Sequence, residues 1–276
     1  KVMLYTLRLK AEALESRHLN KTLRLSDLTQ ALSTLQSCDT LIDNIRYGSS
    51  NENDKLELGA SANDVYEGGV RIAQALSEMT LQGPAYRETA FYFAEKSKSA
   101  VLQESIAEAE AKSFAGIPPD VLETENQLKA SAALLTQKLA QKPPATEEAA
   151  LREQLLTTNQ QYQTLVKRME KEFPDYFNLK FNKVTPTTRD IQKQLHEGQI
   201  VVSYFIAEKG SRIYSFVLTR SKFTVYNSIL PPDFERLIKG FTNGIYFMAT
   251  DVFAESSAAL SRLLLRGVPK AKEITF

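Results

Sequence analysis

The sequence predicts a mostly helical region followed by the opening part of a small α/β domain. From Lys1 to about Glu172 the apolar residues recur at three- and four-residue steps among Leu, Ala, Glu, Gln and Lys, as in packed helices. After Pro174 the pattern changes to alternating, β-branched segments, which are typical of strands. This change predicts a domain boundary near residues 174 to 186.

We expect helices in antiparallel pairs throughout the first region. The first helix carries apolar residues at helical spacing, and the turn at 18–21 leads to a second helix that starts after Ser26 or Asp27 and ends at the polar tip 48–51. Because the last two helices of the region have similar lengths and a short Pro-rich turn between them, they predict a long antiparallel hairpin. The further helices are expected over 61–79, 84–114, 119–141 and 146–173.

The second region predicts a three-stranded antiparallel meander. Thr188 is expected to cap a short helix that runs through Leu195. Two helices should follow the meander, one after Pro231 and one over 253–265, and the last residues, 273–276, predict a strand whose partners we expect beyond the end of this chain. The three strands of the meander are expected over 200–206, 212–218 and 223–229.

Composition and charge exclude several classes of partner. The chain has 34 Lys and Arg residues against 33 Asp and Glu, so its formal net charge of +1 provides no field to hold nucleic acid or an anionic membrane. No window approaches the roughly 18 apolar residues of a membrane-spanning helix. The single cysteine excludes an internal disulfide and a thiolate zinc cage. We therefore expect a cytoplasmic protein without a nucleic-acid or membrane partner.

The two ends of the sequence indicate a piece of a longer protein. The chain has no initiator Met, and it stops inside a strand-like apolar run. We therefore expect part of the functional machinery to lie outside these residues.

Four segments carry a resemblance to a known family. The segment 90–100, AFYFAEKSKSA, is similar to a last repeat helix, and 115–118, AGIP, is similar to the turn after it. The segment 197–205, EGQIVVSYF, followed by 213–219, is similar to an opening hairpin in which a Gly precedes hydrophobic-x-Tyr-Phe. Together they resemble the CHAT-domain proteins found in many bacteria, in which tetratricopeptide repeats precede a caspase-like domain. The chain departs from the full repeat signature, since it has no Trp.

The resemblance implies a division of the chain into three parts. Residues 1–115 would form tetratricopeptide-like helical repeats, 116–174 a long antiparallel helical hairpin, and 175–276 the N-terminal, non-catalytic part of a caspase-like α/β domain. The family's catalytic His and Cys follow the strand that begins here at 274–276, so no catalytic residue carries over to this chain. The resemblance implies a cysteine peptidase as the parent protein and a protein partner for the repeats. The alternative is a non-enzymatic helical-repeat adaptor or scaffold.

The residues themselves predict no complete catalytic site. Cys38 lies on the apolar stripe of the second helix, where a free cysteine usually packs as a small hydrophobe. His18 lies in a turn, and His196 is expected to interact with the end of its own helix. The histidines show no metal-ligand spacing and the glycines no nucleotide-binding pattern, so we predict neither a metal nor a cofactor.

Aromatic side chains on one predicted helix are the candidate partner-binding residues. Tyr86, Tyr92 and Phe93 follow Pro84 together with Phe91, and large rigid side chains make good anchors in the groove of a repeat array. Packing in the core is the favoured alternative, because the interface between repeats also needs bulky residues.

Overall fold

The computed structural model describes residues 2–48, 52–98, 117–181, 185–270 and 272–275. Within these ranges the chain forms ten α-helices and a four-stranded mixed sheet, which confirms the mostly helical α + β class. The chain divides into two compact units. The first combines Lys1–Gly68 with Lys96–Thr185, and the second combines Gly69–Glu95 with Pro186–Phe276.

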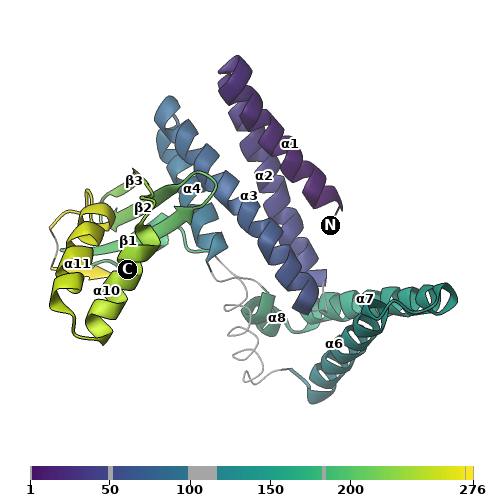
Figure 1. Cartoon of the computed structure of the whole chain (residues 1–276). Coiled ribbons are helices and arrows are strands. Elements are labelled where there is room, and N and C mark those ends of the chain that lie inside the picture. The colour runs from purple at the N-terminus through teal and green to yellow at the C-terminus, as the bar shows by residue number, and fades with distance from the viewer. Residues whose placement is uncertain (1, 49–51, 99–116, 182–184, 271, 276) are drawn as a thin grey trace. The chain divides into compact units, whose positions relative to one another are not determined.

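The first unit opens with the predicted αα-hairpin. Helix α1 (Val2–Arg17) ends in a short π-helical turn, η1 (His18–Thr22), and α2 (Leu25–Gly48) runs back beside it (Figure 1). Leu23 takes a left-handed conformation in the turn, and the amide of Leu23 donates to the carbonyl oxygen of His18. The apolar stripes of the two helices are buried, as their spacing predicts: Leu4, Ala11, Leu14, Leu28, Ala31, Leu32, Leu35, Cys38 and Ile42.

Helices α3 (Glu52–Met79) and α4 (Gly83–Ser97) each contribute to both units. Helix α3 begins at Glu52 rather than at the expected Ser61, and it buries Leu58 in the added turns. Gly68 faces the side chain of Leu35, and Gly69 lies under the ring of Phe93. The predicted continuation of α4 to Phe114 lies outside the described residues.

The predicted long hairpin consists of α6 (Pro119–Ala140) and α7 (Ala145–Glu172). Pro119 stands in the first turn of α6, where a missing amide hydrogen costs no helical bond. A further helix, α8 (Pro174–Phe181), falls where we expected only a domain boundary. It places Tyr176 in a core cluster with residues of α6 and α7: Val121, Leu165 and Met169.

The second unit contains the predicted meander. Strands β1 (Gln199–Ala207), β2 (Arg212–Thr219) and β3 (Phe223–Ile229) pair antiparallel in sequence order. Strand β4 (Glu273–Thr275) pairs parallel with β1, giving the order β3-β2-β1-β4. The expectation that the last strand finds its partners beyond this chain is therefore wrong, because β1 is its neighbour.

The short helix α9 (Thr188–Gln194) precedes the meander, and its cap differs from the predicted one. Thr187, not Thr188, is the N-cap, and its hydroxyl and backbone amide exchange hydrogen bonds with Asp190 in a capping box. Thr188 is buried, and its hydroxyl donates to Glu88 of α4.

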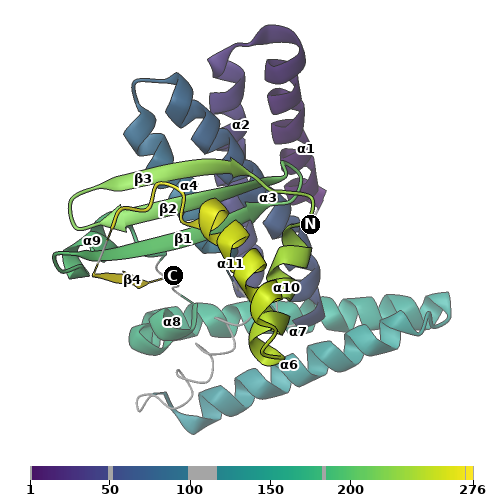
Figure 2. The ribbon, with the colours of Figure 1, turned by 60° about the vertical axis from the view of Figure 1, so that its left-hand side comes forward.

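The two faces of the sheet pack against different helices (Figure 2). On one face the ring of Phe91 in α4 meets those of Phe216 and Phe223 edge-on, with centroids 5.5 and 5.8 Å apart. On the opposite face Tyr204 donates to the carbonyl oxygen of Leu264, 2.7 Å away, at the end of α11. Helices α10 (Phe234–Tyr246) and α11 (Thr250–Leu264) form a hairpin on this second side.

Candidate partner-binding site

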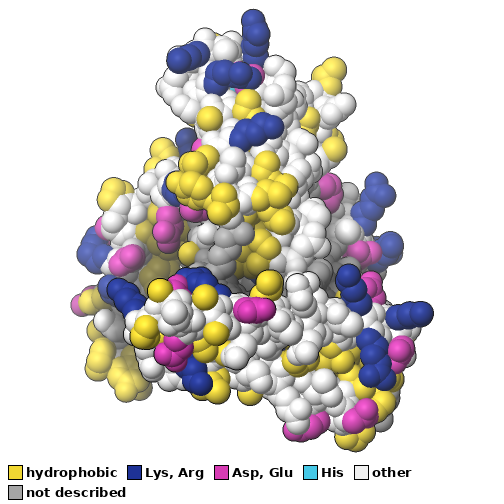
Figure 3. Space-filling model, turned by 90° about the vertical axis from the view of Figure 1, so that its right-hand side faces the viewer, with side chains coloured by type: hydrophobic (Ala, Val, Ile, Leu, Met, Phe, Trp, Pro, Cys, Tyr) yellow, Lys and Arg dark blue, Asp and Glu magenta, His cyan; other side chains and the backbone are white. Residues whose placement is uncertain are grey.

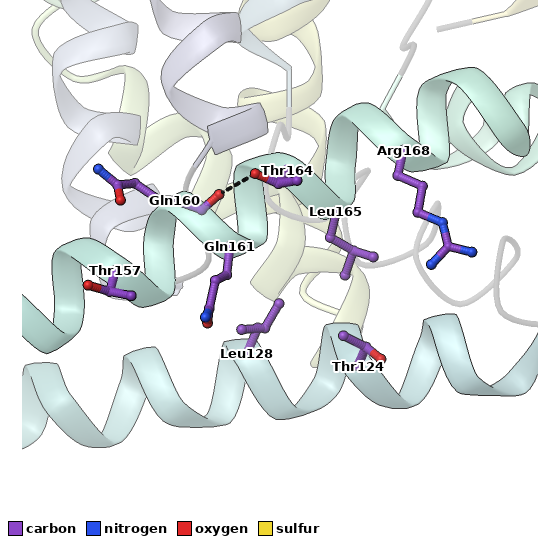
Figure 4. Close-up of a pocket in the computed structure, with 8 residues that line it drawn as sticks. All are labelled: Thr124, Leu128, Thr157, Gln160, Gln161, Thr164, Leu165 and Arg168. Carbon is purple, nitrogen blue, oxygen red and sulfur yellow. Dashed lines mark hydrogen bonds between the residues drawn. The ribbon is translucent and has the colours of Figure 1, made fainter.

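The α6–α7 hairpin carries an open groove between its two helices (Figure 4). The groove has a volume of about 590 Å³. Leu128 and Leu165 supply its apolar floor, and an exposed rim of polar side chains surrounds them. The rim residues are Thr124, Thr157, Gln160, Gln161, Thr164 and Arg168.

A second hollow of about 620 Å³ continues this groove along the same hairpin, and Thr157 lines both. Its apolar residues are Leu134 and Leu135, and Leu134 is 52% exposed. From Thr124 to Lys138 the two hollows follow α6 for roughly 20 Å, at 1.5 Å per residue. We call the two hollows together the hairpin groove. Its length matches three to four turns of a helix, ~5.4 Å per turn.

The chemistry of the hairpin groove suits a helix with an apolar stripe. The hydroxyl groups of Thr124 and Thr164 already donate to backbone carbonyls one turn earlier in their own helices. The side-chain amides of Gln160 and Gln161 have no hydrogen-bond partner within the described part of the chain. A helix with an apolar stripe would cover the exposed Leu134 and the half-buried Leu128 and Leu135, while its polar side chains would reach the rim.

A buried ion pair holds the hairpin to α8. Glu125 of α6 is 1% exposed, and both of its carboxylate oxygens lie 2.6 Å from Nζ of Lys180 in α8. Tyr176 donates to the same carboxylate, and Lys129 lies 3.2 Å away. Burial alone would raise the pKa of Glu125, but the two lysines outweigh it and hold the pKa below its usual range. Glu125 is therefore ionised and paired at neutral pH.

The predicted aromatic residues occupy different environments. Phe93 is fully buried, and its ring packs on Gly69 so closely that a Cβ atom there would lie 2.5 Å from it. Phe93 is thus a core residue and is not available on the surface. Tyr86 and Tyr92 are half-buried, and the ring of Tyr92 meets that of Phe93 edge-on at 5.6 Å. Partner binding by these two tyrosines stays a prediction.

Cys38 and His18 are buried at sites that suit structural roles, whereas His196 is exposed. Cys38 is fully buried, and this burial raises the pKa of its thiol to about 11. The Nδ1 atom of the buried His18 lies 2.8 Å from the carbonyl oxygen of Arg24, within the turn that joins α1 and α2. His196 is exposed after α9. In the ranges that the structure describes, no three His, Cys, Asp or Glu side chains gather into a metal site.

On the face in Figure 3, basic and acidic side chains are interspersed. None of the described helices is long and apolar enough to cross a membrane.

Comparisons of the chain with protein-family models, curated proteins and solved structures find no significant match.

The residues of the hairpin groove were not among the predicted site residues. Thr, Gln and Ser at helical spacing have the appearance of an ordinary solvated helix face. One sequence pattern does indicate the groove: these polar residues recur at helical spacing on both helices of the predicted antiparallel pair. Leucines such as Leu128 and Leu134 lie among them.

Proposed function

We propose that this chain is the partner-binding and regulatory region of a CHAT-type, caspase-like cysteine peptidase, whose catalytic His and Cys lie outside residues 1–276. The helical first part senses a protein partner. The sheet transmits the presence of that partner to the catalytic part of the parent protein.

The observation that carries the proposal is the order of the sheet. The hairpin that contains Tyr204 and Phe205 belongs to an antiparallel meander, yet β4 returns parallel to β1 after the two helices α10 and α11. A parallel strand reached through a helical crossover is the way in which α/β domains extend their sheets. The outer edge of β4 has no neighbouring strand among the described residues, so a further strand can add there.

The hairpin groove supports the sensing role. It is long and open, with the exposed Leu134 and the half-buried Leu128 and Leu135 among mostly uncharged polar neighbours, a combination that fits the apolar face of a partner helix. Thr and Gln dominate the lining of the groove, and its charged residues, Arg168, Lys138 and Glu153, are of both signs. This lining offers a small charged substrate no cluster of opposite charge.

Peptidase activity provides the test of the catalytic part. The purified chain should cleave no peptide, whereas the parent protein should, through a His and a Cys on successive strands after Phe276. Replacing that Cys by Ala should abolish cleavage. The assignment is wrong if residues 1–276 alone cleave a peptide and Cys38→Ser removes the activity.

The alternative function is a non-enzymatic helical-repeat adaptor. The burial of Cys38 is expected under both functions, because neither uses this thiol as a nucleophile. The adaptor replaces the peptidase if the sequence after Phe276 in the parent lacks a His and Cys pair.

Partner capture tests the groove. The double variant Leu134→Glu/Gln161→Glu places two charges in the hairpin groove and should lose a protein that the wild-type chain retains. Ala133→Glu/Gln163→Glu adds the same charge at exposed positions of the same helices outside the groove and should retain it. A parallel arm, Tyr86→Ala/Tyr92→Ala, tests the aromatic prediction. Equal capture by all variants would eliminate both surfaces.

A further inference from the structure

Strand β3 leaves one edge of the sheet without a neighbouring strand in the described residues. It lies at the opposite end of the sheet from β4 and pairs only with β2 (Figure 2). This edge is formed by other elements than the hairpin groove, and it lies opposite the edge at which β4 lies. We refer to the outer side of Phe223–Ile229 as the β3 edge.

The hydrogen bonds around β3 establish which backbone groups point outward. The amide of Thr219 donates to Lys222 O at one end of the β2–β3 ladder, and the amide of Leu230 donates to Ser211 O at the other. Antiparallel pairs alternate between bonded and non-bonded residues. Thr224, Tyr226 and Ser228 therefore face β2, whereas the amides and carbonyls of Phe223, Val225, Asn227 and Ile229 face away from it.

The β3 edge lacks the features that protect natural edge strands. Such strands carry Lys, Pro, an inward charge or a bulge that prevents another strand from pairing. The seven residues of β3, FTVYNSI, include no charged residue, no Pro and no Gly. Their register with β2 is continuous, without a bulge. An uncharged edge without a bulge selects an extended backbone as its ligand.

The charges at the start of the β3 edge define its ligand further. Arg220 and Lys222 are exposed at the β2–β3 turn, and neither side chain has an ion-pair partner in the part of the chain that the structure describes. We propose that the β3 edge binds an extended segment of a partner protein as an additional antiparallel strand. The C-terminal end of that segment lies beside Phe223, where acidic residues meet Arg220 and Lys222.

A second copy of this chain fits the β3 edge less well. Two β3 strands paired antiparallel would bring Asp233 of one copy toward Arg220 of the other. Asp233 is already 2.7 Å from Arg236 of its own chain. The segment 220–232 contains no acidic residue, so self-pairing would leave the two basic side chains unpaired.

Binding of a synthetic peptide to the full chain tests the proposal. The probe is labelled Val-Thr-Val-Thr-Val-Thr-Glu-Glu, and fluorescence anisotropy should show saturable binding. Methylating the backbone nitrogens on the bonding side of the peptide should weaken binding about tenfold or more, because each lost donor removes a ladder bond. The same number of methyl groups on the other side should have a smaller effect. Moving the two Glu residues to the N-terminus should also weaken binding.

Variants of the chain provide the matched controls. Arg220→Glu/Lys222→Glu should weaken binding about tenfold, whereas Lys239→Glu/Arg262→Glu, which makes the same charge change on α10 and α11, should not. Val225→Pro should abolish binding without loss of the fold, since it removes only an outward amide. The midpoint of thermal unfolding of the Val225→Pro chain, compared with that of the wild-type chain, checks that the fold is retained.

Residue-resolved amide exchange decides the geometry. Without peptide, the amides of Val225 and Asn227 should exchange faster than those of Thr224 and Tyr226, and saturating peptide should protect them. The proposal is overturned if they stay unprotected when the peptide is bound, if N-methylated and unmodified peptides bind equally, or if the free chain forms a dimer that Val225→Pro dissociates.

Discussion

At the scale of single residues, Glu125 is a buried carboxylate whose charge must be stabilised by its neighbours. Its carboxylate is removed from water, which costs free energy unless a positive partner and hydrogen bonds compensate. Lys180 and Tyr176 from α8 and Lys129 from α6 provide that compensation. Lys180 also lies over the ring of Tyr176, with Nζ 5.2 Å from the ring centroid. Removing one member of the cluster leaves a buried group unpaired.

We predict that Glu125→Gln lowers the free energy of unfolding by about 3 kcal/mol, because the buried ammonium of Lys180 loses its counter-charge. Denaturant titration followed by circular dichroism measures the change. The double variant Glu125→Met/Lys180→Met should recover most of the loss, since it buries no charge. Glu148→Gln, which breaks the exposed pair with Arg152, should have almost no effect. A Glu125→Gln variant as stable as wild type would mean that the pair contributes nothing.

The lowered pKa of Glu125 also predicts a pH dependence. The folded chain holds this pKa below its unfolded value, so the stabilisation is fully present above the unfolded pKa of about 4.3 and is lost as the pH falls through the folded pKa. The stability difference between wild type and Glu125→Gln should therefore be constant near neutral pH and shrink below about pH 4. A difference that grows on acidification would contradict this assignment.

At the scale of elements, the sequence predicts what depends on local patterns. The helices of the long hairpin end within one or two residues of their predicted limits, because Pro and short polar turns define them. The three strands of the meander are equally clear from their β-branched alternation. Strand β4 is visible as a segment, but its pairing with β1 is not, since a three-residue strand contains no information about a partner 74 positions away.

Contacts between distant residues account for the other differences. Lys180 lies 55 positions from Glu125, and both resemble ordinary charged residues of solvated helices. The start of α3 was missed because Glu52–Leu58 has few apolar residues at helical spacing. Phe93 was a candidate surface anchor, but the absence of a side chain at Gly69 lets its ring enter the core. Periodicity alone does not separate such a core aromatic from an exposed one.

The α10–α11 hairpin depends on close contact between its helices. A Cβ atom on Gly244 would lie 2.8 Å from Cβ of Phe253 and 2.9 Å from its backbone, so the two helices must move apart to accept one. We predict that Gly244→Ala lowers the free energy of unfolding by about 1 to 3 kcal/mol. Gly59→Ala should instead stabilise the chain by up to ~1 kcal/mol, since nothing lies within 4 Å and alanine favours the helix. Thermal unfolding measures the loss of stability expected for Gly244→Ala and the gain expected for Gly59→Ala. Equal shifts of the unfolding midpoint in the two variants would refute the close contact between Gly244 and Phe253.

At the scale of the whole molecule, the two compact units share helices rather than a linker. The division of α3 falls between Gly68 and Gly69, and that of α4 between Glu95 and Lys96. In α4, Phe91 packs on the sheet of the second unit, while Lys96 lies 2.6 Å from Asp43 in the first. Because a helix forms cooperatively, losing the part of α3 that belongs to one unit weakens the part that belongs to the other. Unfolding of one unit should therefore spread to the other.

We predict that a core substitution in the second unit exposes the thiol of the first. Phe91→Ala should lower stability by about 3 kcal/mol, through the cavity left beside Phe216 and Phe223. Cys38 is fully buried with a raised thiol pKa, so it should react with a thiol reagent only through opening of the first unit. If the two units open together, Phe91→Ala should speed labelling of Cys38 about a hundredfold. The reaction rate in denaturant should be identical for both chains. Unchanged labelling of Cys38 in a Phe91→Ala chain whose sheet is measurably destabilised would show that the units unfold independently.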